Sequence, residues 1–199
     1  MVTVAHAQTL PESTNFQVGD KLIYQTKASG KTSKYEFVFT EADSSHVRGT
    51  ASIDGKQMEF EAPAHGYLGK EFCLAEIMEC EWSPAVKIFD RSTKLGDKWS
   101  DSTIIKMKNN TVVEETIESR VEKFEKVKVP AGEFESFRID ATGTIKAKVE
   151  KGDVYTGTLK MKTWFGVVGN RLVLIKREYT NSFRQPFLQE LSKLPELAN

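Results

Sequence analysis

Apolar and polar residues alternate with a period of two along most of this chain. In the clearest run, 137–149, every second residue is apolar or small and the residues between are polar or charged. Since successive side chains of a strand point to opposite faces, this pattern predicts a long, half-buried β-strand. Similar runs cover 155–165 and 171–181, after turns at 151–153 and 166–170. We therefore expect an antiparallel meander of three strands.

The N-terminal half shows the same alternation between turn dipeptides. The Ser-Gly at 29–30 and the Asp-Gly at 54–55 are turn signals, and the second strongly indicates a two-residue hairpin. Strand-like runs also fill 103–129 and end at the Pro-Ala-Gly of 130–132. We expect about nine to ten strands in an all-β fold, a single antiparallel sheet curled into an open barrel or half-barrel. The alternative is a β-sandwich of two sheets.

Two stretches do not alternate. The first, 63–95, contains both cysteines and an acidic cluster, and it is interpreted as a crossover or lid packed over the sheet. The second, 186–195, begins and ends with proline and predicts a short helix. The apolar stripe of this helix would be Phe187, Leu188, Leu191 and Leu194.

Length and charge indicate one domain with no electrostatic preference for nucleic acid. The chain has 199 residues, and its 28 basic residues balance its 28 acidic ones. No apolar run is long enough to span a membrane. Val-Ala-His-Ala at 4–7 fits a signal-peptidase site, so 1–7 is interpreted as a signal-peptide remnant cleaved near Ala7. The alternative for 1–7 is an ordinary disordered N-terminus. Residues 8–199 would form one periplasmic domain.

The two cysteines, Cys73 and Cys80, suit an oxidising compartment. Residues seven apart on a helix are about 10 Å apart along the axis, beyond disulfide reach, so a bridge implies a loop or hairpin. We predict the disulfide, and the alternative is two buried thiols.

Catalytic and metal-binding patterns are weak. The three histidines have no metal-ligand spacing, the chain has no Gly-x-Ser-x-Gly motif, and the glutamates of 71–81 match no calcium loop. The sequence therefore predicts a protein that is not an enzyme and needs no metal or cofactor. Trp82, Trp99 and Trp164 are candidates for stacking on a sugar or lipid headgroup, although core or rim positions are the more ordinary explanation.

A concave apolar face is the candidate ligand site. Small residues on otherwise apolar strands, such as Ala141, Gly143 and Gly157, either leave room for a guest or serve only sheet curvature. Ile145 lies on the same predicted stripe. The candidate ligand-binding residues are Tyr35, Phe37, Phe39, Phe137, Ile139, Ala141, Gly143, Leu159, Met161, Val173 and Ile175.

Three segments resemble a family of exported bacterial β proteins of unknown function. They are Leu-Gly-Asp-Lys-Trp at 95–99, the run 127–139 with Val-Pro-Ala-Gly-Glu-Phe inside it, and Trp-Phe-Gly-Val-Val-Gly at 164–169 with Ile-Lys-Arg-Glu at 175–178. The family is similar in architecture to the half-barrels of periplasmic lipoprotein carriers, whose concave face takes acyl chains. Phe165 stands where the family usually has tyrosine. The resemblance implies fold and compartment and supplies no catalytic residue.

Two functions are therefore compared. The preferred hypothesis is a non-enzymatic periplasmic carrier of a hydrophobic, acyl or lipid-like ligand. The alternative is a module that docks on an envelope protein through a strand edge or the 63–95 loop. Neither hypothesis involves nucleic acid or a membrane-spanning segment.

Overall fold

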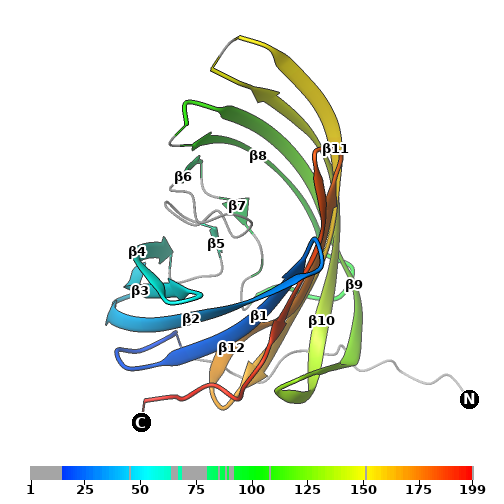
Figure 1. Ribbon diagram of the computed structural model, residues 1–199. Coiled ribbons are helices and arrows are strands. Elements are labelled where there is room, and N and C mark those ends of the chain that lie inside the picture. The colour runs from blue at the N-terminus through cyan, green and yellow to red at the C-terminus, as the bar shows by residue number, and fades with distance from the viewer. Residues whose placement is uncertain are drawn as a thin grey trace, which may run out of the picture.

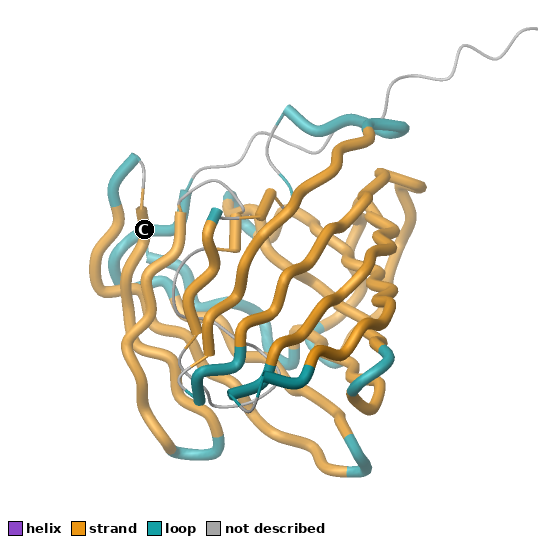
Figure 2. Tube along the Cα trace, turned by 90° about the horizontal axis from the view of Figure 1, so that it is seen from above, coloured by secondary structure: helices purple, strands orange, loops and turns teal. Residues whose placement is uncertain are grey.

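The computed structural model describes residues 15–44, 46–63, 67–68, 80–84, 86–87, 89, 92–107, 109–150 and 152–198. These residues form strands and loops, and no helix is present among them (Figure 2). The strands are β1 (Lys21–Ala28), β2 (Lys31–Ala42), β3 (His46–Ile53), β4 (Lys56–Pro63), β5 (Tyr67–Leu68), β6 (Cys80–Ser83), β7 (Val86–Lys87), β8 (Lys98–Met107), β9 (Val112–Val129), β10 (Gly132–Lys148), β11 (Val154–Val168), β12 (Arg171–Asn181) and β13 (Arg184–Leu191).

Eleven of these strands form one sheet, in the order β4-β3-β2-β1-β13-β12-β11-β10-β9-β8-β6. Every neighbouring pair is antiparallel. The sheet curls through a wide arc, and its two edge strands, β4 and β6, are not paired with each other in the described part of the chain (Figure 1). The prediction of an all-β, open, curled antiparallel sheet is confirmed, with one strand more than the upper expectation.

The segment predicted as a crossover joins opposite edges of the sheet. The chain leaves β4 at one edge and enters the sheet again as β6 at the other. In sequence, β5 lies between β4 and β6, and β7 follows β6. These two short strands pair with each other as a separate two-stranded sheet on the concave side (Figure 1). Most of 63–95 lies outside the described residues, and so does Cys73; the lid interpretation and the disulfide therefore stay predictions, as does the signal remnant at 1–7.

The predicted hairpin turns have the backbone geometry that their residues favour. Asp54 and Gly55 have φ of 49° and 87°, and Ser29 and Gly30 have φ of 50° and 75°. Two successive residues with positive φ are typical of a type I′ turn, whose twist matches that of the flanking strands. The turns therefore fix the register of β1 with β2 and of β3 with β4.

The predicted helix over 186–195 is wrong, because this segment contains most of β13. The strand lies between β1 and β12 and is paired with both. Without it, the facing edges of β1 and β12 would lack hydrogen-bond partners inside the sheet. Pro186 has no partner in either register and sits where the pairing with β12 becomes irregular, so its missing N–H breaks no ladder.

Local irregularities increase the curl of the sheet. The register shifts within β9–β10, β11–β12, β12–β13 and β2–β3. Such bulges bend a strand and increase its twist. At Gly143 a Cβ would lie 2.2 Å from the carbonyl oxygen of Thr116, and at Gly49 it would lie 2.0 Å from that of Val38. Glycine at these positions permits close approach of two backbones.

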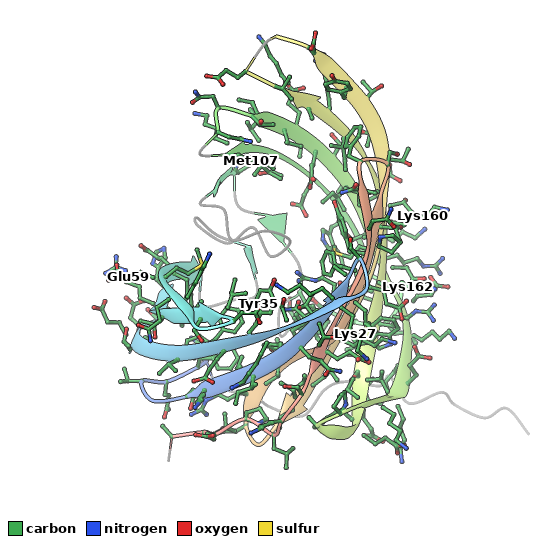
Figure 3. All side chains as sticks on the ribbon, in the orientation of Figure 1. Lys27, Tyr35, Glu59, Met107, Lys160 and Lys162 are labelled. Carbon is green, nitrogen blue, oxygen red and sulfur yellow. The ribbon has the colours of Figure 1, made fainter. Side chains whose placement is uncertain are left out.

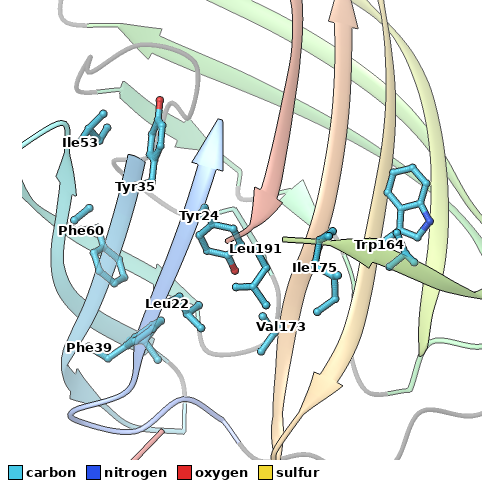
Figure 4. Packing of buried hydrophobic residues seen from close by; sticks show 14 residues of the cluster. Leu22, Tyr24, Tyr35, Phe39, Ile53, Phe60, Trp164, Val173, Ile175 and Leu191 are labelled. Carbon is cyan, nitrogen blue, oxygen red and sulfur yellow. The ribbon is translucent and has the colours of Figure 1, made fainter. Parts of the chain in front are cut away.

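The buried apolar residues form three clusters. The large cluster contains Leu22, Tyr24, Tyr35, Phe39, Val47, Ala51, Ile53, Phe60, Val127, Val129, Trp164, Val173, Ile175 and Leu191. The hairpin cluster contains Ile105, Val113, Ile117, Ala141, Ile145 and Leu159, and the phenylalanine cluster contains Phe89, Val121, Phe137, Ile139 and Phe165. Figure 4 shows side chains of β1, such as Leu22 and Tyr24, facing Val173, Ile175 and Leu191 from the C-terminal strands.

Candidate functional site

The concave face of the sheet carries the candidate site. Cross-strand partners share a face, so the register determines which residues point into the curl. Lys27, Lys160 and Lys162 point to the convex side, whereas Tyr35 and Met107 point to the concave side (Figure 3). Alternation along β1 and β11 consequently places Thr26, Met161 and Thr163 on the concave face.

The predicted ligand-binding residues are buried or half-buried, and they are divided among the three clusters. The large cluster includes Tyr35, Phe39, Val173 and Ile175, with Phe37 packed against it. The hairpin cluster includes Ala141 and Leu159 with Met161, and the phenylalanine cluster includes Phe137 and Ile139. The structure therefore brings these residues together as three neighbouring apolar surfaces rather than one continuous stripe.

The glycines on this face do not leave free space. The Thr116 backbone fills the position beside Gly143. At Gly157, a Cβ would lie 2.7 Å from Ser182 and 2.9 Å from Phe183. Of the two explanations for these small residues, the structure favours sheet curvature. Ala141 is 2% exposed within the hairpin cluster and remains the position where added bulk would test for space.

A row of buried polar side chains crosses the concave face. Thr26 on β1 is opposite Gln189 on β13, Gln189 is opposite Arg177 on β12, and Arg177 is opposite Thr163 on β11. We call these four residues the polar band. They are at most 6% exposed. In the described part of the chain, Thr26 Oγ1, Gln189 Oε1, Arg177 Nε and Thr163 Oγ1 are buried atoms without a hydrogen-bond partner.

The polar band lies between apolar surfaces. Along β12, Ile175 of the large cluster precedes Arg177, and Tyr179, which packs against the hairpin cluster, follows it. Along β13, Leu191 of the large cluster is two residues from Gln189. Leaving a buried polar group unpaired costs free energy, commonly about 1–3 kcal/mol. Four adjacent cases mark this row as a functional candidate.

Arg177 carries a positive charge into this environment. Burial lowers its pKa from 12.5 to about 10, so the guanidinium stays protonated at neutral pH. Burial also raises the pKa of the neighbouring Tyr24 phenol, which therefore stays neutral and supplies no counter-charge. No carboxylate of the described residues forms an ion pair with Arg177. A buried cation of this kind is most easily stabilised by an anion.

The alternation in the sequence places part of this band on the concave face. The alternation that places Val173, Ile175 and Tyr179 on one face places Arg177 there too. Thr163 likewise falls between Met161 and Phe165 on its strand. Gln189 was hidden by the wrong helix prediction, because only the pairing of β13 with β12 brings it beside Arg177.

The other candidates have structural roles or remain untested. Trp164 is buried; its indole Nε1 donates to Glu125 Oε1 at 3.0 Å, and Lys176 Nζ lies 4.9 Å from its ring centroid. Trp99 packs against the phenylalanine cluster, and the side chain of Trp82 lies outside the described set. The described residues contain no group of three or more potential metal ligands. They also contain no helix long and apolar enough to cross a membrane.

Known proteins share the fold of this chain at low sequence identity. One solved structure is that of a candidate lipoprotein from Parabacteroides distasonis ATCC 8503, with 15% identity, a TM-score of 0.61, and coverage of 94% of this chain and 99% of that one. Another is a candidate exported protein with a YmcC-like fold from Bacteroides fragilis NCTC 9343, with 14% identity, a TM-score of 0.60 and the same coverages. No family model and no curated protein sequence matches this chain. The likeness establishes the fold class, an open curled antiparallel sheet.

Proposed function

We propose that this chain is an exported, non-enzymatic protein of the periplasm that binds a hydrophobic, acyl or lipid-like ligand on its concave face. The observation that carries the proposal is the buried polar band set between the apolar clusters of an open, curled sheet. A protein interior without a ligand rarely leaves adjacent polar groups unpaired. An amphiphilic guest would contact both the apolar surfaces and the polar band.

Export is supported by two independent features. The Val-Ala-His-Ala sequence at 4–7 fits a signal-peptidase site. The two structural neighbours are described as a candidate lipoprotein and a candidate exported protein. The resemblance of 96–99, 129–134 and 164–169 to an exported β family agrees with this compartment.

Native mass spectrometry of the purified protein, before and after solvent extraction, tests ligand binding. We expect a co-purifying species of acyl mass that extraction removes. The paired variants are Ala141→Leu, which places a leucine on the concave side of β10, and Thr142→Leu, which places the same side chain on the exposed convex side. Ala141→Leu should lose the acyl species at an unchanged melting temperature, and Thr142→Leu should keep it.

Two results would contradict the carrier proposal. One is a parent protein that carries no acyl compound and takes up none when incubated with lipid vesicles. The other is a marked fall in melting temperature for Ala141→Leu, about 1–3 kcal/mol of stability, with no ligand detected on the parent. The hairpin cluster would then be ordinary core.

Docking on an envelope protein is the second candidate, and the edge strand β4 favours it. Among the described residues of the main sheet, β4 pairs with β3 alone, and its other edge is the candidate for strand addition. A proline replacing Glu59 would block such pairing. If docking is the function, this variant should lose binding to an isolated partner and keep any bound acyl compound.

A further inference from the structure

The polar band contains one positively charged side chain, that of Arg177. The residues around Arg177 indicate which ligand head group it would bind. Arg171, the other buried arginine, is paired: its Nε lies 2.6 Å from Asp20 Oδ2. Arg138 is paired with Asp140 at 2.7 Å and with Glu125 at 3.6 Å. Arg177 is only 5% exposed, and no carboxylate of the described residues pairs with it. A buried guanidinium without an ion-pair partner is best stabilised by an anion.

The neighbours of Arg177 suit a planar anion with two oxygens. Its guanidinium offers N–H donors in a fixed fork, which matches the geometry of a carboxylate. Thr163 on the adjacent strand adds a hydroxyl donor, and Gln189 on the other adjacent strand adds an amide that can present its NH₂ group. Directly opposed side chains of neighbouring strands have Cβ atoms about 4.5–5.5 Å apart, so Thr163 and Gln189 lie beside Arg177 on either side, where they flank a head group bound to its guanidinium.

The apolar surroundings define the rest of the ligand. Ile175 and Leu191 lie on one side of the polar band, and Met161 and Tyr179 lie on the other. None of these side chains offers a positive charge. A chain attached to the head group would therefore contact hydrocarbon and aromatic surface in either direction along the strands.

We propose that the ligand is a long-chain carboxylate, and that Arg177, with Thr163 and Gln189, binds its head group. This inference rests on the proposed function and adds the chemical class of the ligand. A neutral amphiphile of the same chain length would leave the guanidinium without a counter-charge. The site should therefore discriminate by head group as well as by chain.

Competition between oleate and oleyl alcohol tests the inference, since the two differ only at the head. With solvent-extracted protein and a fluorescent fatty-acid probe, the parent should bind oleate about tenfold or more tightly than the alcohol. Arg177→Met should weaken oleate binding about ten- to a hundredfold and leave the alcohol unchanged. Arg177→Lys keeps the charge and should retain part of the preference. Arg120→Met, on the exposed convex side of β9, removes the same charge and should change neither affinity.

Stability distinguishes a ligand-binding arginine from a structural one. Without ligand, the buried guanidinium is an uncompensated charge, so Arg177→Met should melt at the same temperature as the parent or higher. A large fall in melting temperature, or equal weakening for oleate and the alcohol, would overturn the inference. Unchanged oleate binding in Arg177→Met would overturn it too but leave the carrier proposal standing. A parent that binds neither ligand would overturn the carrier proposal itself.

Discussion

Two buried arginines on β12 differ in whether a carboxylate pairs with the guanidinium. Arg171, at the start of the strand, pairs with Asp20, whose carboxylate also accepts hydrogen bonds from the Gln17 and Ala198 amides at 2.8 Å. This arrangement satisfies both charges and ties the C-terminal segment to the residues before β1. Arg177, six residues later on the same face of the strand, has no such partner among the described residues. The first arginine stabilises the fold, and we assign the second to a ligand.

Breaking the Asp20–Arg171 pair should be costly. Arg171→Met leaves the Asp20 carboxylate buried without its counter-charge, and we expect a loss of about 3–5 kcal/mol in the free energy of unfolding, measured by urea denaturation. Arg48→Met is the control. Arg48 pairs with Glu41 and Glu61 at the surface, where solvent screens the charges, so its removal should change stability little. Equal losses in the two variants would contradict the structural role of the buried pair.

Gly143 is the second residue whose role can be isolated. A methyl group there would meet the Thr116 carbonyl oxygen at 2.2 Å, and that oxygen belongs to the backbone of a central strand. We expect Gly143→Ala to lower the free energy of unfolding by about 1–3 kcal/mol or more. Gly152→Ala is the comparison, since that glycine has a positive φ of 90° but no atom within 4 Å of an added Cβ. A smaller loss for Gly143→Ala than for Gly152→Ala would show that the strands can separate at low cost.

At the level of elements, β13 shows why a local pattern can mislead. Phe187, Leu188 and Leu191 have helical spacing, and Pro186 suits a first helical turn. The segment is nevertheless a strand, because β1 and β12 both need a hydrogen-bonding partner between them. The pairing with β12 is local, but the pairing with β1 joins residues more than 150 positions apart along the chain, such as Gln25 and Glu190. No window of sequence around β13 contains this information.

Proline substitutions test the position of β13. Leu188 lies within the register with both neighbours, opposite Lys27 and Glu178. A proline there would remove an N–H from the middle of the sheet, so Leu188→Pro should cost about 3 kcal/mol or more, measured as the fall in free energy of unfolding. Pro186→Ala should be nearly neutral, because no strand pairs with that position. A tolerated Leu188→Pro would contradict the central placement of β13.

At the scale of the whole molecule, the sequence predicted the class of the fold and missed the strand β13, which joins the N-terminal strands to the C-terminal ones. Period-two alternation and the dipeptides at 29–30 and 54–55 were sufficient for strands and hairpins, because both depend on neighbouring residues. The candidate site was predicted in part: its apolar members follow from alternation, as with Ile139 and Ile175. The polar band could not be assembled in advance, since Thr26, Gln189 and Arg177 meet only through β13.

The pairing of β1 with β13 also makes one core from both ends of the chain. The large cluster joins Leu22 and Tyr24 of β1 to Ile175 of β12 and Leu191 of β13 (Figure 4). Leu191 is fully buried at the centre of this contact. If the two halves depend on the same core, they should lose their structure together rather than in separate steps.

Hydrogen exchange on Leu191→Ala tests this cooperativity. Removing a fully buried leucine side chain should lower the free energy of unfolding by about 2–5 kcal/mol. Because both halves share the large cluster, the most protected amides of β2 and β3 and those of β10 and β11 should lose protection by the same amount. Leu159→Ala is the comparison. Leu159 belongs to the hairpin cluster, and that cluster contains no residue of β1 to β4. Protection that falls in β2 and β3 alone would show that the N-terminal strands open as an independent unit, and that β13 joins two separately stable parts.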